Sequence, residues 1–126
     1  MRRILPLLAA MAVLACGDAV SGTYQFVSIS GTELPATIEF FGTHTFTSGS
    51  LTLTSDSTFT LTATSHEANG DPETERGSGT FTLDDSNVIQ LIPGPDSDDM
   101  AVTEGTWDGD QISVKVTDDI TFVFRR

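Results

Sequence analysis

Residues 51–63 read LTLTSDSTFTLTA, and this stretch determines how the rest of the chain is interpreted. Apolar residues alternate with threonine on both sides of a short break, Ser55-Asp56-Ser57. A period of two places the apolar side chains on one face of a β-strand and the threonines on the other. Aspartate and serine favour a turn because their side chains bond to nearby backbone groups. The stretch therefore predicts a β-hairpin with one buried face.

The same alternation recurs along the chain and predicts an all-β domain. The expected strands cover residues 22–30, 44–54, 58–64, 77–83, 87–92, 100–107, 111–117 and 120–125. Because eight is an even number, the last strand can pair antiparallel with the first and remove the sheet edges. We therefore expect an eight-stranded antiparallel up-and-down barrel over residues 22–126.

The apolar positions of these strands should point into the barrel. The predicted inward residues are Tyr24, Phe26, Leu51, Leu53, Phe59, Leu61, Phe81, Leu83, Ile89, Leu91, Trp107, Ile112, Val114, Ile120, Phe122 and Phe124. An eight-stranded barrel is just wide enough to be filled by its own side chains or to hold one small ligand. The sequence leaves both possibilities open.

The segment at 32–42 is interpreted as a long loop. A ninth strand at 36–41 would make the closing pair parallel, which an up-and-down barrel does not use. We therefore expect a lid whose apolar side chains fold back over the barrel, namely Leu34, Pro35, Ile38, Phe40 and Phe41. Alternating strand direction then places the tight turns at 55–57, 84–86 and 108–110 at one end. The longer loops at 31–43, 65–76 and 93–99 lie at the other end with the turn at 118–119.

The first fifteen residues have the layout of a secretory signal peptide. Arg2 and Arg3 precede a twelve-residue apolar run that ends at Ala15. This run is too short to span a bilayer, which needs ~20 apolar residues. Residues 1–15 are therefore predicted to be a cleaved leader.

Val13-Leu14-Ala15, directly before Cys16, resembles a bacterial lipobox. The resemblance implies a lipid on Cys16 and a short tether over residues 16–21. It also implies a place in the bacterial cell envelope, anchored to a membrane and facing the periplasm, with the outer membrane favoured by Gly17. The chain has a single cysteine, so it has no internal disulfide framework, and acylation accounts for the odd thiol. The alternative is ordinary cleavage nearby with Cys16 unmodified.

Charge and missing motifs exclude several classes of function. Eighteen Asp and Glu against six Lys and Arg give a net charge of −12, which disfavours binding to nucleic acid and to anionic membrane surfaces. The chain has no Gly-x-Ser-x-Gly or His-Glu-x-x-His motif, so we expect neither an enzyme nor a cofactor. The acidic loop residues Asp96, Asp98 and Asp99 offer oxygen ligands for a divalent cation. Their spacing is not that of a regular calcium-binding loop.

The two ends of the domain resemble the lipocalin-like domains of bacterial lipoproteins. In lipocalins a Gly-x-Trp begins the first strand, and an arginine from the last strand packs over the ring. Here Gly22-Thr23-Tyr24 occupies the first position, with Tyr in place of Trp, and Arg125 or Arg126 supplies the cation. The resemblance implies that these residues form a structural closure.

The predicted function is binding at the long-loop end of a lipid-anchored barrel. The expected partner is a small apolar or amphipathic molecule, or an envelope protein, contacted by Leu34, Ile38, Phe40, Phe41 and Trp107. One alternative is a filled-core structural or interaction lipoprotein without a small ligand. A second alternative is divalent-cation binding by the acidic loops.

Overall fold

The computed structural model describes residues 19–39, 42–95, 97 and 101–126. Ala19 and Val20 are helical, and the rest of the described chain forms strands and turns. Ten strands occur within these residues: β1 (Gly22–Ile29), β2 (Thr32–Glu33), β3 (Ala36–Glu39), β4 (Thr43–Leu53), β5 (Thr58–Glu67), β6 (Glu73–Leu83), β7 (Val88–Pro93), β8 (Thr103–Trp107), β9 (Gln111–Lys115) and β10 (Thr121–Arg125).

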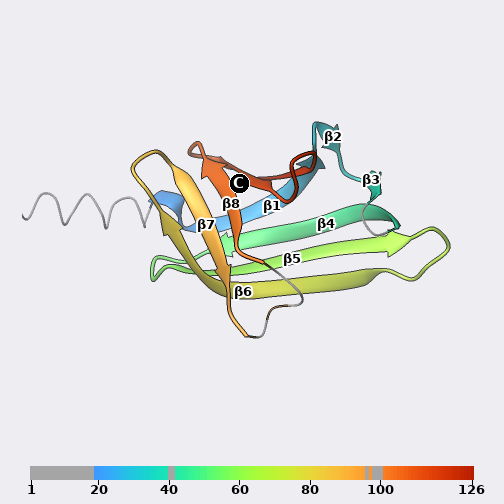
Figure 1. Cartoon of the computed structure of the whole chain (residues 1–126), viewed down its shortest axis with the longest axis horizontal. Helices are drawn as coiled ribbons and strands as arrows, with labels where there is room; N and C mark the ends of the chain where they lie inside the picture. Colours follow the sequence, from blue (N-terminus) through green and yellow to red (C-terminus); the bar gives the residue numbers. More distant parts are fainter. Residues whose placement is uncertain (1–18, 40–41, 96, 98–100) are drawn as a thin grey trace, which may run out of the picture.

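Eight of the strands close into an antiparallel barrel (Figure 1). Each strand from β4 to β10 pairs antiparallel with the next one in sequence. β1 closes the ring because it pairs antiparallel with β10 on one side and with β4 on the other. The predicted eight-stranded barrel and its antiparallel closure are confirmed.

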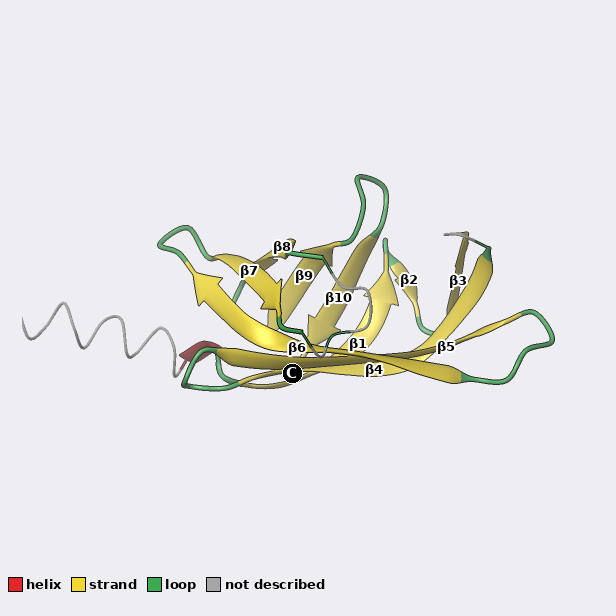
Figure 2. Cartoon of the chain, turned by 60° about the horizontal axis from the view of Figure 1, so that its bottom comes forward, coloured by secondary structure: helices red, strands yellow, loops and turns green. Residues whose placement is uncertain are grey.

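The expectation that residues 32–42 form only a loop was wrong, since they contain β2 and β3. β3 pairs with the first part of β4, with Ile38 opposite His44, while β1 pairs with the second part, with Tyr24 opposite Leu51. β2 is only two residues long and forms a hairpin with the end of β1. Both short strands therefore sit where β1 and β4 diverge, outside the ring (Figure 2). Closure stays antiparallel because β3 never takes a place in the ring.

The barrel has a closed end and an open end. The closed end carries the chain entry and the tight turns after β4, β6 and β8, whereas the open end carries the longer connections. The turn at 54–57 shows why these sequences reverse the chain. Thr54 and Thr58 hydroxyls donate to the Asp56 carboxylate, and these bonds hold the pKa of Asp56 below its ordinary value. Ser57 takes a positive φ of 69° to complete the turn.

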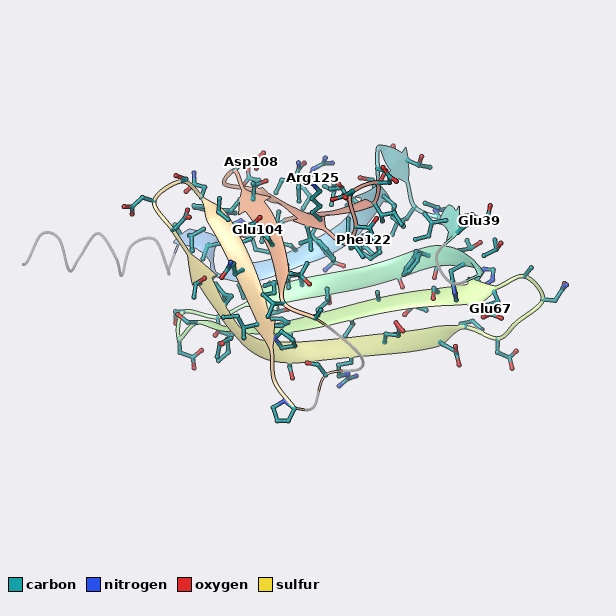
Figure 3. The ribbon with its side chains drawn as sticks, viewed as in Figure 1. Glu39, Glu67, Glu104, Asp108, Phe122 and Arg125 are labelled. Carbon is teal, nitrogen blue, oxygen red and sulfur yellow. The ribbon has the colours of Figure 1, made fainter. Side chains whose placement is uncertain are left out.

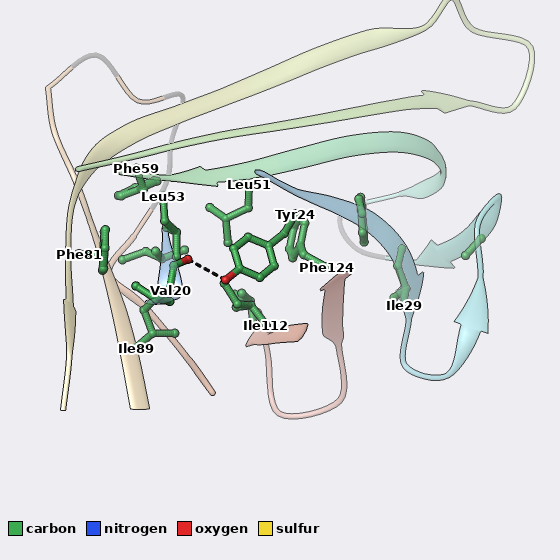
Figure 4. Close-up of a cluster of buried hydrophobic side chains, with 14 residues drawn as sticks. Val20, Tyr24, Ile29, Leu51, Leu53, Phe59, Phe81, Ile89, Ile112 and Phe124 are labelled. Carbon is green, nitrogen blue, oxygen red and sulfur yellow. Dashed lines mark hydrogen bonds between the residues drawn. The ribbon is translucent and has the colours of Figure 1, made fainter. Parts of the chain in front are cut away.

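The closed half of the barrel is filled by its own side chains (Figure 4). Its fully buried members include Tyr24, Leu51, Leu53, Phe59, Ile89, Leu91, Ile112 and Phe124, all predicted to point inward. The threonines of the same strands face outward, where their hydroxyls pair across strands. Thr64 and Thr74 Oγ1 atoms are 2.8 Å apart, and those of Thr23 and Thr52 are 3.1 Å apart.

Candidate functional site

A cavity of about 320 Å³ lies inside the open half of the barrel. Its walls are mainly apolar side chains from β4, β5, β9 and β10, including Phe46, Leu61, Ala63, Val114, Phe122 and Phe124. These side chains occupy alternate positions along their strands, so the strand period that builds the core also builds the cavity wall. The barrel is therefore filled at one end and hollow at the other.

Four phenylalanine rings form the boundary between the cavity and the filled half. The Phe26 ring stacks on those of Phe122 and Phe124, with centroids 4.7 Å and 4.9 Å apart. Phe46 meets Phe122 edge to face at 5.2 Å. Phe124 is 1 % exposed and also lines the cavity, so the rings belong to both parts. Such contacts hold the rings in fixed orientations, which gives the base of the cavity a defined apolar surface.

The wall of the cavity becomes acidic toward the open end. β4, β5 and β6 extend beyond the rest of the barrel (Figures 1 and 2). On this extension Ala63 lies opposite Glu75 and Ser65 lies opposite Glu73. Paired residues share a face of the sheet, so both glutamates lie on the inner face that continues the cavity wall. Glu75 itself lines the cavity.

Glu67 lies on the same inner face further out. It is opposite His44, which is in turn opposite Ile38, a residue that lines the cavity. Figure 3 shows Glu67 at the outer end of β5. We call Glu67, Glu73 and Glu75 the acidic rim. The inner face of the extension thus changes from apolar near the barrel to anionic at its outer end.

A second hollow of about 490 Å³ lies beside the first, between the β2–β3 segment and the turn after β9. Ile38 and Ile120 line both. The second hollow is wider and has a mixed lining, with Ser30, Thr37 and Asp119 among its residues. The first is the better candidate for ligand binding, because small-molecule sites are mostly apolar with few polar groups.

The structure separates the residues that the sequence grouped as a binding site. Ile38 lines the cavity, and Leu34 packs against the core without lining it. Phe40 and Phe41 lie outside the described residues. Trp107 is at the closed end, where its Nε1 donates to the Gly109 carbonyl at 3.1 Å. The grouping of Trp107 with the lid residues is therefore corrected.

Two lining residues were missed for identifiable reasons. A β-bulge between Phe46 and Ser48 shifts the alternation of β4, so Phe46 points inward although it is out of phase with Leu51. Glu75 lies in the segment 65–76, which the sequence predicts to be a loop because it lacks apolar alternation. The β5–β6 ladder nevertheless continues out to Ser65 opposite Glu73.

The closure predicted from the two ends of the chain involves Arg126. Its Cζ lies 4.9 Å from the centre of the Tyr24 ring. The guanidinium also donates to the carbonyls of Ser21, Ala19 and Gly109 at 2.8, 2.7 and 2.7 Å. Arg125 instead donates to the Gln111 side chain at 2.9 Å. Arg126 thus ties the start, the end and one turn of the domain together.

Tyr24 is fully buried beneath this arginine. Its hydroxyl donates to the Val20 carbonyl at 2.7 Å, the bond drawn in Figure 4. Burial raises the pKa of Tyr24 above its ordinary value, and the charge of Arg126 partly opposes the rise. A Cβ on Gly22 would lie 3.3 Å from Nη1 of Arg126, so glycine leaves room for the guanidinium. The Arg126 guanidinium, the Tyr24 ring and the bonded backbone carbonyls together stabilise the closed end of the barrel.

Other predicted features fall partly outside the described chain. Cys16, Asp96, Asp98 and Asp99 are not among the described residues. Among those that are described, no group of three or more His, Cys, Asp or Glu side chains is arranged to hold a metal ion. The described residues also contain no helix that is long and apolar enough to cross a membrane.

No protein-family model, curated protein or solved structure matches this chain.

Proposed function

We propose that this protein binds a small apolar or amphipathic molecule in the cavity at the open end of its barrel. The observation that supports the proposal is the hollow open half, whose volume of about 320 Å³ lies above an apolar aromatic base. Ligand pockets in proteins are typically about 300–1,000 Å³ and mostly apolar. Each Å² of apolar ligand surface that leaves water contributes about 25 cal/mol. A filled-core barrel would leave no such space.

The proposal includes attachment to the bacterial cell envelope through a lipid on Cys16. The lipobox-like Val13-Leu14-Ala15 supports it, as does the lone cysteine. Only three residue steps separate Cys16 from Ala19, whose carbonyl binds Arg126 at the closed end. Three extended residues span at most ~10 Å, so the closed end would lie close to the membrane. The cavity would then open away from it, toward the periplasm.

Fluorescence of N-phenyl-1-naphthylamine, a neutral apolar probe, tests the binding proposal. The chain with Cys16→Ser, exported to a bacterial periplasm and purified without detergent, should bind the probe saturably with about one site. Ala63→Phe places a ring in the cavity and should abolish binding. Thr62→Phe, on the outer face of the same strand, is the matched control and should bind normally. Absence of saturable binding, or equal binding by the Ala63→Phe variant, would contradict the proposal.

The anchor is tested separately by fractionating cells that express the full chain. The wild-type protein should sediment with membranes and carry the extra mass of a lipid. Cys16→Ser should lose that mass and move to the soluble fraction, because two acyl chains give stable attachment that the protein alone does not. Unchanged partitioning of the variant would overturn the anchor.

A further inference from the structure

We infer that the ligand of the cavity is a cationic amphiphile, with an apolar body in the barrel and a protonated amine at the acidic rim. The inference rests on the proposed function and specifies the chemical class of its ligand. It follows from the order in which polarity changes along one continuous wall. The wall runs from Phe122 and Phe124 through Leu61 and Ala63 to Glu75.

The apolar part of the wall selects only for an apolar body. Phe122, Phe124 and Leu61 offer no hydrogen-bonding atom, so a polar group placed against them would lose its hydration without compensation. A ligand with one polar end would therefore leave that end at the open mouth. The group that it meets there is the Glu75 carboxylate, which lines the cavity opposite Ala63.

The charge at the mouth then favours one kind of polar end. Glu73 and Glu67 continue the same inner face beyond Glu75, and the whole chain has a net charge of −12. A carboxylate or phosphate at this position would face like charges, whereas an ammonium group would face opposite ones. Opposite charges attract and like charges repel, so a cationic ligand should gain affinity at this position and an anionic ligand should lose it by a measurable factor.

Arg76 also borders the cavity, and its positive charge could offset the negative charge of the acidic rim. It lies opposite Thr62, and the Thr62 hydroxyl pairs with that of Ser50 on the outer face. By this register the Arg76 side chain leaves the strand on the outer face, whereas the three rim glutamates leave on the inner face. The inner face therefore keeps its excess of negative charge.

Three ligands with the same ten-carbon chain test the inference: decylamine, decanol and decanoate. Each is titrated below its micelle concentration or solubility limit against the probe-loaded Cys16→Ser chain at neutral pH. Decanol should displace the probe, decylamine should do so about tenfold more tightly, and decanoate should be the weakest. Glu75→Gln should reduce the advantage of decylamine over decanol severalfold.

The matched control is Glu104→Gln, which removes the same charge from the outer face of β8, opposite Lys115 (Figure 3). It should keep the full preference for decylamine. If decanol displaces the probe and decylamine is no better, the choice of a cation is wrong while cavity binding stands. If decanoate binds best and Arg76→Gln removes its advantage, Arg76 governs the mouth and the inference is overturned. If none of the three displaces the bound probe, the cavity does not accept a decyl amphiphile and the inference is overturned, while saturable probe binding still supports the proposed function.

Discussion

The contact between Arg126 and Tyr24 stabilises the closed end of the barrel. The guanidinium covers the ring and donates to three backbone carbonyls, two of which precede β1. The arginine thus supplies hydrogen-bond donors to backbone carbonyls that lie outside the strands. One side chain thus joins residues that are more than a hundred positions apart in sequence.

Replacing Arg126 should therefore destabilise the barrel. Arg126→Gln removes the cation from the ring and shortens the side chain, so we expect a loss of about 1–3 kcal/mol in the free energy of unfolding. Arg125→Gln is the control, because Arg125 reaches only the exposed Gln111 side chain and should cost less than about 0.5 kcal/mol. Urea denaturation of both variants measures the difference. Equal losses would show that Arg126 has no special role.

Tyr24 provides a pH-dependent readout of the same contact. Burial raises its pKa above 10.0, so the folded state holds the phenolic proton more tightly than the unfolded state does. The stabilisation is complete below the unfolded pKa of about 10 and is lost as pH rises toward the folded pKa. Because the chain has one tyrosine, tyrosinate absorbance reports this residue alone. The native protein should titrate at higher pH than the same chain in urea, and an equal or lower midpoint would contradict the burial.

At the scale of the elements, strand β6 leaves the extension and joins the barrel where it begins to pair with β7. Gly79 sits at this point, opposite Phe59 on β5 and Pro93 on β7. A Cβ on Gly79 would lie 2.1 Å from the Ile92 carbonyl oxygen, which is backbone and cannot rotate away. Glycine is required here by the close approach of the two strands.

Gly79→Ala should consequently cost more than about 2 kcal/mol in the free energy of unfolding, because β7 must move to admit the methyl group. Gly94→Ala is the matched control. The nearest atom to a Cβ on Gly94 is the Ser78 carbonyl oxygen at 3.5 Å, an ordinary contact. It should change stability by less than about 1 kcal/mol, as measured by thermal and urea denaturation. A Gly79→Ala protein as stable as the control would show that the strands separate without cost.

For the molecule as a whole, the excess of negative charge opposes folding into a compact barrel. With a net charge of −12, carboxylates are closer together in the folded state than in the unfolded chain. Salt screens this repulsion, since the Debye length falls to about 10 Å at 0.1 M. Raising NaCl from low to moderate concentration at neutral pH should increase the melting temperature by roughly 2–5 °C.

The control for this prediction is the same titration near pH 4.1, the isoelectric point of the chain. There the net repulsion vanishes, and salt should have little effect or lower the melting temperature. A salt-independent melting temperature at neutral pH would show that the charges are too well separated or too well solvated to influence stability.

The sequence by itself determined the strands that bury apolar side chains and the turns between them. Alternation around Leu51 and Phe59 reports burial of one face, and Asp56 and Ser57 encode a turn through local bonds and a positive φ. The even strand count then required an antiparallel closure. These features depend on neighbours in sequence or on parity, so they can be read without the structure.

Only the tertiary structure decided where the barrel is filled and where it is hollow. The bulge at Phe46 directs that ring inward. Backbone pairing extends β5 and β6 beyond the residues that show apolar alternation. The extension brought Glu75 onto the cavity wall. Alternation tells which face a side chain takes, but not how far along the barrel axis it lies or what faces it across the interior. The cavity depends on those distances, which pairing between distant strands sets.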